Sequence, residues 1–122
     1  MPPNCSFIID DAEETWTFDT KFDLIHVRTM GGALKNLPKF LSQTLEHLKP
    51  GGWIEWQEYE TTVTSDDNTI PEKFALGDWT TNVNTAAAKI GQPTNIAVTL
   101  GDVITQAGFK NVKDQVYKVS IY

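Results

Sequence analysis

The 122-residue sequence predicts a single α/β domain whose strands run parallel. Short apolar runs at 7–9, 22–28, 53–58 and 112–121 alternate with longer stretches of helical period. Strands that alternate with helices of this length are typical of parallel sheets joined by right-handed crossovers. We therefore expect one domain over residues 1–122.

Two of the expected strands have features that suggest a buried sheet. Phe7-Ile8-Ile9 is apolar on both faces and leads into Asp10-Asp11, which suits an interior strand of a parallel sheet. The run Phe22–Arg28 is mostly apolar and rich in β-branched residues. The last run, Val112–Ile121, places its apolar side chains on one face, because strand side chains alternate.

Three stretches have the three-to-four-residue period of amphipathic helices. The first runs from 33 to 48 and is stopped by Lys49-Pro50-Gly51-Gly52, which removes a donor and supplies permissive backbone. The second covers 76–90 and the third 100–107. The polar segment 61–68 is expected to be a flexible loop.

Composition excludes several classes of protein. The net charge of −6 argues against a nucleic-acid-binding face, which needs clustered lysine and arginine. No apolar run approaches the roughly 20 residues of a membrane helix, and the start MPPNCSF does not resemble a signal peptide. The single cysteine, Cys5, excludes an internal disulfide and has no metal-ligand spacing around it. We expect a cytoplasmic protein whose partners are small molecules or proteins, without a metal, nucleic acid or membrane.

Four stretches, in this order, resemble the class I S-adenosylmethionine (SAM)-dependent methyltransferases, and above all their fungal LaeA-like branch found in secondary metabolism. They are Pro2-Pro3-Asn4 with Asp10-Asp11-Ala12-Glu13, Phe22–Arg28, Leu48–Glu55 (LKPGGWIE) and Gln106-Ala107-Gly108-Phe109. The resemblance implies a partial Rossmann-like methyltransferase fold, namely the carboxyl-terminal part of a doubly wound, mostly parallel sheet with flanking helices.

The resemblance also implies roles for particular residues. Asp11 would hydrogen-bond the adenine amino group of SAM, with Ala12 beside the ring and Trp16 in the loop near it. His26 and Arg28 would lie where the substrate and the methyl group meet.

The chain departs from the family pattern at its most specific motif. The Gly-x-Gly-x-Gly turn after the first family strand is not in this sequence, and neither is the acidic residue that ends the second. Gly31-Gly32 follows the wrong strand, and Met1 stands just ahead of the third family strand. Without the close backbone approach and the ribose carboxylate, we expect a truncated domain that holds no cofactor by itself, SAM included.

Candidate catalytic residues lie near the carboxyl ends of the expected strands, where open parallel sheets bind ligands. His26 is the first choice for proton transfer, or else a hydrogen-bonded interior histidine. Arg28 would stabilise an enolate or carboxylate, or form a surface ion pair. Asp11 is the second choice of base, against a loop cap. Glu58 would be a further acid/base, or an exposed carboxylate.

Aromatic residues are the candidate walls of a substrate pocket. Trp53 and Trp56 must point to opposite faces of their strand, and Trp56 together with Trp16 is assigned to the pocket. The alternative for each tryptophan is a place in the core or at an interface.

Two classes of function fit these observations. In the first, the chain is a methyltransferase-like enzyme of fungal natural-product biosynthesis, repurposed for cofactor-independent cyclisation or isomerisation of a small molecule. In the second, it is a methyltransferase fragment or assembly module completed by a partner chain, either a second copy in a homodimer or another protein.

Overall fold

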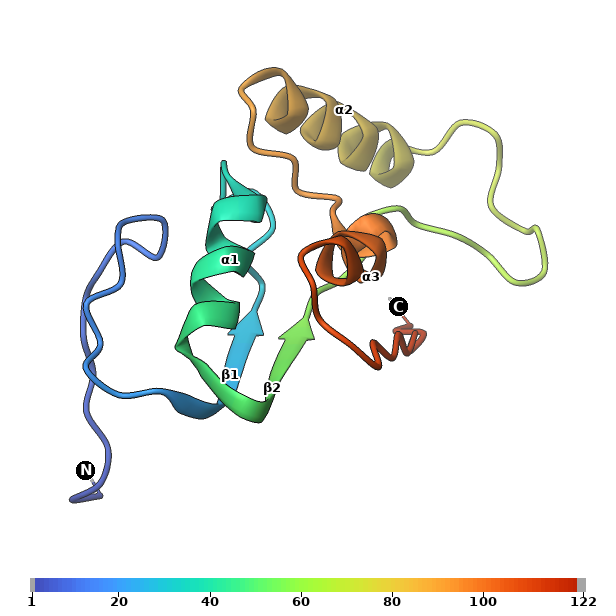
Figure 1. Cartoon of the computed structure of the whole chain (residues 1–122). Helices are drawn as coiled ribbons and strands as arrows, with labels where there is room; N and C mark the ends of the chain where they lie inside the picture. The colour runs from blue at the N-terminus through green and yellow to red at the C-terminus, as the bar shows by residue number, and fades with distance from the viewer. Residues whose placement is uncertain (1, 121–122) are drawn as a thin grey trace.

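The computed structural model describes residues 2–120, which form two strands and three helices (Figure 1). In chain order these are β1 (Phe22–Arg28), α1 (Leu37–His47), β2 (Leu48–Gln57), α2 (Ala75–Lys89) and α3 (Ala97–Gln106). The predicted α/β class is confirmed. No helix in this part of the chain is long and apolar enough to cross a membrane.

The two strands form a parallel pair with α1 as the crossover between them. In Figure 1 both arrows point the same way. The register sets Ile25 beside Ile54 and Val27 beside Trp56. Beyond the strand end, the Thr29 amide donates to the Gln57 carbonyl at 2.9 Å. Parallel strands require such a crossover, because a tight turn joins only antiparallel neighbours.

Helix α1 begins four residues later than the sequence predicts. The side chain of Asn36 accepts a hydrogen bond from the Lys39 amide at 3.0 Å and so caps the helix. Residues 31–33 instead form a turn, with the Ala33 amide donating to the Met30 carbonyl at 3.0 Å, and residues 34–36 have no helical structure. The helix ends where Leu48 adopts an extended conformation, directly at the start of β2.

The core lies on one face of the sheet. Helices α1 and α3 both cover this face, with Leu41 of α1 fully buried and Leu100 and Ile104 of α3 nearly so. The inward side chains of the strands complete it, Val27 being 5% exposed. The buried cluster consists of Val27, Leu34, Phe40, Leu41, Leu48, Leu100, Ile104 and Phe109.

The opposite face of the sheet is uncovered within the described residues. Leu24 and Trp53, which are paired across the strands, are 54% and 60% exposed. Trp53 and Trp56 point to opposite faces, as predicted, and Trp56 is the half-buried one. We call the surface formed by the outward side chains of both strands the bare face; it carries Leu24, His26, Arg28, Trp53, Glu55 and Gln57.

The strand predicted at Phe7–Ile9 does not form. These residues pair with no strand, their side chains are 69–105% exposed, and the N-terminal segment does not join the sheet in Figure 1. In the doubly wound order 3-2-1-4-5-6, the third strand pairs only with the second. The neighbour that this run requires is therefore not among the elements that residues 2–120 form.

The strand predicted at 112–121 is also wrong for residues 112–120, and Ile121 lies outside the described part of the chain. Val116, Tyr117 and Val119 are 74–86% exposed and unpaired. Helix α2 matches its predicted range to one residue, but its apolar side chains remain uncovered, with Trp79 61% exposed. A strand or an amphipathic helix becomes stable only against a neighbour.

Candidate functional site

The carboxyl half of the bare face brings together two of the four predicted catalytic side chains, His26 and Arg28. The register pairs His26 with Glu55 and Arg28 with Gln57, and all four side chains are exposed. The amino half of the same face is instead apolar, formed by Leu24 and Trp53. The bare face is thus divided into an apolar half and a polar half.

His26 forms a cross-strand pair with a carboxylate that the sequence analysis missed. Its Nδ1 lies 2.9 Å from Oε2 of Glu55, and the two side chains are 41% and 56% exposed. A carboxylate oxygen is an acceptor, so Nδ1 carries the proton and donates it. The alternative of an interior histidine does not hold in this structure, because the imidazole is exposed.

Arg28 is exposed at the end of β1 and belongs to none of the ion pairs within residues 2–120. The surface ion pair considered as its alternative role is therefore not seen there. Thr29, the next residue, has a φ of 53°, in the left-handed region that a β-branched residue rarely adopts. Such backbone strain costs on the order of 1–3 kcal/mol and often marks functional segments.

Glu58 holds the turn that follows β1. Its Oε2 accepts hydrogen bonds from the backbone amides of Met30 and Gly31 at 3.0 and 2.9 Å, and the residue is half-buried. Two successive N–H groups that converge on one oxygen form a small anion-binding nest, here filled by the protein's own carboxylate. Glu58 is thus not the exposed carboxylate of the alternative interpretation, and its acid/base role stays a prediction.

The turn held by Glu58 also packs against the segment that precedes α3. The Gly32 amide donates to the Pro93 carbonyl at 2.9 Å, and Gly32 has a φ of 80°. A Cβ atom added at Gly31 would lie 2.8 Å from the Thr94 carbonyl oxygen, which is closer than real Cβ atoms approach. The glycine pair after β1 therefore serves this close backbone contact.

The residues assigned to adenine, Asp11 and Ala12, lie in a loop that contacts the amino end of α1. Asp11 is exposed, and its Oδ1 accepts from the Glu13 amide at 2.9 Å, which closes a local turn. The carboxylate of Glu13, a residue the sequence analysis did not select, accepts from the Lys35 and Asn36 amides and so ties this loop to α1. Asp11 therefore makes the contacts of a loop cap, which is the alternative to its role as a base.

The two predicted pocket walls, Trp16 and Trp56, are partly buried and pack against the core. Trp16 donates its indole N–H to the Ala12 carbonyl at 2.9 Å, and its ring packs edge-on against Phe40 with centroids 5.6 Å apart. Trp56 also packs edge-on against Phe40, at the same centroid distance. Neither ring lines the hollow beside α3 or the one between α1 and α3.

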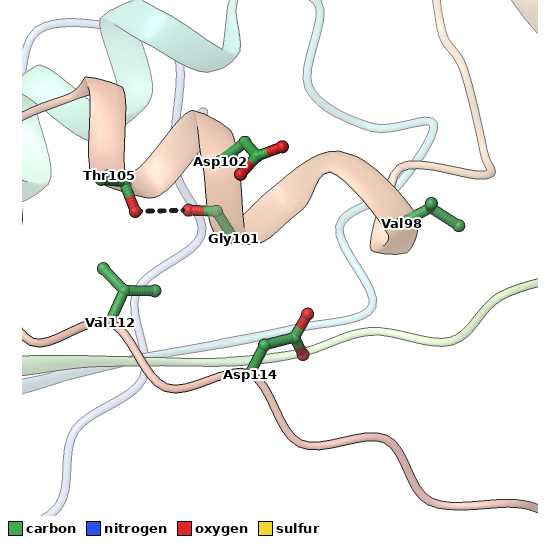
Figure 2. Close-up of a pocket in the computed structure, with 6 residues that line it drawn as sticks. All are labelled: Val98, Gly101, Asp102, Thr105, Val112 and Asp114. Atoms are coloured by element: carbon green, nitrogen blue, oxygen red, sulfur yellow. Dashed lines mark hydrogen bonds between the residues drawn. The ribbon is translucent and has the colours of Figure 1, made fainter.

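The larger of these hollows, about 240 Å³, lies between α3 and the segment that follows it (Figure 2). It is lined by Val98, Gly101, Asp102, Thr105, Val112 and Asp114. Figure 2 shows its carboxylates, and no basic or histidine side chain is among its lining residues. No group of three or more histidine, cysteine, aspartate or glutamate side chains suited to a metal occurs in residues 2–120.

The fold and these contacts agree with what comparisons of the sequence with known proteins show. Residues 2–114 match the family described as methyltransferase domain. The chain therefore belongs to the methyltransferase domain family. No solved structure matches it significantly.

Similar curated proteins come from fungi. The chain is 32% identical over 120 residues to methyltransferase pytC of Aspergillus terreus, covering 98% of this chain and 37% of that protein. It is 34% identical over 119 residues to the probable methyltransferase tdiE of Emericella nidulans, covering 96% and 37%. It is 31% identical over 122 residues to the secondary metabolism regulator LAE1 of Cochliobolus heterostrophus, covering 98% and 40%. The chain thus spans well under half the length of these relatives.

As they are placed within residues 2–120, the residues that the resemblance assigns to adenine do not fit SAM, the methyl donor that the family resemblance suggests. The sequence has no glycine-rich turn after a first strand and no ribose-binding carboxylate. Asp11 is engaged in its own turn, and Trp16 is held by Ala12 and the core. What remains is one exposed aspartate beside Ala12, which leaves the methionine and ribose portions of SAM without partners.

Proposed function

We propose that the chain is the substrate-binding part of a methyltransferase-fold protein that acts on a small molecule of fungal secondary metabolism. In this proposal the protein is cytoplasmic, and the chain does not bind SAM alone. It acts once a complementary segment, on the same or another polypeptide, pairs with the open edge of β1. The single observation that carries this proposal is that β1 has an open edge, while the Phe7–Ile9 run has no strand to pair with among the described residues.

The topology explains why these two features occur together. In the doubly wound order, the fourth and fifth strands pair with each other, while the first strand lies on the fourth strand's other edge. β1 and β2 behave as this fourth and fifth pair. A first strand would pair with β1, and a second strand next to it would give the Phe7–Ile9 run its neighbour.

The division of the bare face supports the same arrangement. Right-handed crossovers place the helices of the two halves of a doubly wound sheet on opposite faces. A covering helix would pack on the apolar half, Leu24 and Trp53, which are more than half exposed. The polar half would remain accessible as a cleft over His26 and Arg28.

Calorimetry with SAM tests the proposal. We expect no binding to chain 1–122 alone, and binding in a mixture with a segment that supplies the first half of a class I methyltransferase sheet. The variant Leu24→Asp tests the interface, because it places a charge on the apolar half and should abolish binding in the mixture. Tight binding of SAM to the chain alone, with an unchanged oligomeric state, would refute the proposal.

In the absence of a complementary segment, we propose that a second copy of the chain covers the same surfaces. The open edge of β1 and the exposed side chains of Phe7–Ile9 favour symmetric association, since a two-fold contact is the commonest solution. Light scattering should give a mass above the 13.7 kDa of one chain at micromolar concentration. A stable monomer would contradict this expectation.

The His26–Glu55 pair favours a second candidate function, in which the chain catalyses cyclisation or isomerisation without a cofactor. Proton transfer by one positioned imidazole is sufficient chemistry for such reactions. Metabolite profiles of cells with and without the gene should then differ by an accumulated precursor. Purified protein should convert this precursor without SAM, whereas conversion that depends on added SAM would exclude this candidate.

A further inference from the structure

We propose that Glu55 is the positioning residue of His26, and that this pair, with Arg28, binds and deprotonates a small molecule with one weakly acidic proton. A phenol or an enolisable carbonyl compound is the class of substrate that fits. The substrate class rests on the proposed function. The positioning role rests only on the geometry of the two strands.

The orientation of the imidazole follows from the hydrogen bond. Oε2 of Glu55 lies 2.9 Å from Nδ1 of His26 and accepts its proton. In the neutral imidazole, Nε2 then keeps its lone pair and can accept a proton from a ligand. Nε2 has no hydrogen-bond partner among residues 2–120.

This pair differs from the other ion pairs within the described residues. Those pairs join lysines, Lys49 to Asp23 and Lys118 to Asp66, and a lysine has no acceptor atom. An imidazole gains and loses a proton near neutral pH, and a fixed carboxylate on its other nitrogen orients it and stabilises its protonated form. Of these three pairs, only His26–Glu55 is built for proton transfer.

Arg28 lies on the same face as His26, two residues further along β1. Two residues of a strand span roughly 6.5 Å, so a ligand of one or two rings would contact both side chains. Arg28 is exposed and belongs to none of the ion pairs of residues 2–120, which leaves its guanidinium available to an anion. Across from it stands Gln57, which adds no competing charge.

The chemical step balances with these groups alone. The O–H or C–H bond of the substrate breaks, its electron pair stays on the substrate as a phenolate or enolate, and the proton moves to Nε2 of His26. Glu55 stabilises the imidazolium, while Arg28 stabilises the anion. Return of the proton to another atom of the same substrate would complete an isomerisation.

The test is the tautomer of His26, measured by nitrogen-15 NMR of the imidazole rings above the titration range of an ordinary histidine. We expect the proton on Nδ1 in the wild-type chain, and a shift toward the Nε2-protonated tautomer in Glu55→Ala. His47 is an internal standard, because its Nδ1 lies 2.8 Å from the Gln43 carbonyl oxygen and must also carry the proton. Its signals should not change while the fold is intact.

The matched control is Asp23→Ala, which removes a carboxylate of the other cross-strand ion pair in the same sheet. It should leave the His26 tautomer unchanged. A wild-type His26 protonated on Nε2 would overturn the proposal, and so would an unchanged tautomer in Glu55→Ala. If Glu55→Ala fails to fold, which His47 would report, the wild-type tautomer decides by itself.

Turnover separates this inference from the proposed function. With a substrate in hand, His26→Ala should lower kcat on the order of 100-fold or more. Glu55→Ala should lower kcat by a smaller factor with little change in KM, because Glu55 acts through His26. The expected tautomer without turnover by the chain alone would contradict the cofactor-independent candidate function only, whereas turnover unaffected by Glu55→Ala would contradict the positioning role.

Discussion

The carboxylate of Glu58 stabilises the turn after β1, and Glu58→Ala should lower the free energy of unfolding markedly. In the structure, one oxygen of this carboxylate accepts from the Met30 and Gly31 amides at 3.0 and 2.9 Å. The indole of Trp56 adds a longer contact of 3.5 Å. The substitution removes the acceptor of both amides and leaves them half-buried.

The magnitude follows from the number and kind of these bonds. A hydrogen bond to a charged group contributes about 1.5–3 kcal/mol, and partial exposure places these two at the lower end. Glu58→Ala should therefore cost about 2–4 kcal/mol, a large share of the roughly 5–15 kcal/mol that stabilises a domain. Glu58→Gln keeps an acceptor oxygen without the charge, and should cost about half as much or less.

Urea unfolding followed by tryptophan fluorescence measures these differences, with an unchanged denaturant dependence as the sign of intact two-state behaviour. The matched control is Glu60→Ala, which removes the same charge from an exposed residue without a hydrogen-bonding side chain among those described. It should change stability by no more than about 0.5 kcal/mol. If Glu58→Ala matches this control, the carboxylate does not hold the turn and the reasoning fails.

Three further predictions test the core and the loops. Gly31→Ala should lower the unfolding free energy by about 1–3 kcal/mol in urea, because its Cβ would lie 2.8 Å from the Thr94 carbonyl. Leu41→Ala, at a fully buried position, should cost about 3–5 kcal/mol by the same measurement. The hydroxyl of Ser65 lowers the pKa of Asp67 to about 2, so the stabilisation of its turn should persist above pH 3.8 and be lost toward pH 2, as NMR titration would show.

Local sequence signals determined the elements that the structure confirms. β1 has the predicted bounds, Phe22–Arg28, because its β-branched run is bounded by polar residues and followed by a glycine pair. Helix α2 agrees to one residue at each end. These signals come from residues that are close together in the sequence, so they do not require contact with a distant segment.

The two wrong strands failed for a non-local reason. The Phe7–Ile9 run and residues 112–120 have the composition of strands, but a strand is stabilised by hydrogen bonds to a neighbouring strand. Within residues 2–120, β1 and β2 pair with each other, and neither segment pairs with the outer edge of either strand. Composition predicts that a segment favours extended backbone, and does not show whether the chain contains its partner.

Part of the candidate site could likewise be predicted from local sequence, and part depended on contacts between distant segments. Alternation along β1 predicts that His26 and Arg28 share a face, and the structure places both on the bare face. Glu55 was missed because its contact with His26 depends on the register between two strands that are 29 residues apart at this point. The turn-holding contacts of Glu58 with residues 30 and 31 depend on the same register. Glu55 lies two residues after Trp53 and therefore on the same face, but only the register shows that it is opposite His26.

Leu24, Trp53 and the Phe7–Ile9 run are exposed because nothing among the described residues packs on them. Fully burying a large apolar side chain contributes about 1.5–3 kcal/mol, so Leu24, Trp53 and the Phe7–Ile9 run together leave several kcal/mol unrealised. In the doubly wound order, the first half of the sheet would lie along the open edge of β1 and bring helices over the bare face. The opposite face, under α1 and α3, is well packed, with Leu41 and Thr44 fully buried. Leu24, Trp53 and the Phe7–Ile9 run would therefore each gain a neighbour from that half, whereas Trp79, Val116, Tyr117 and Val119 are exposed elsewhere.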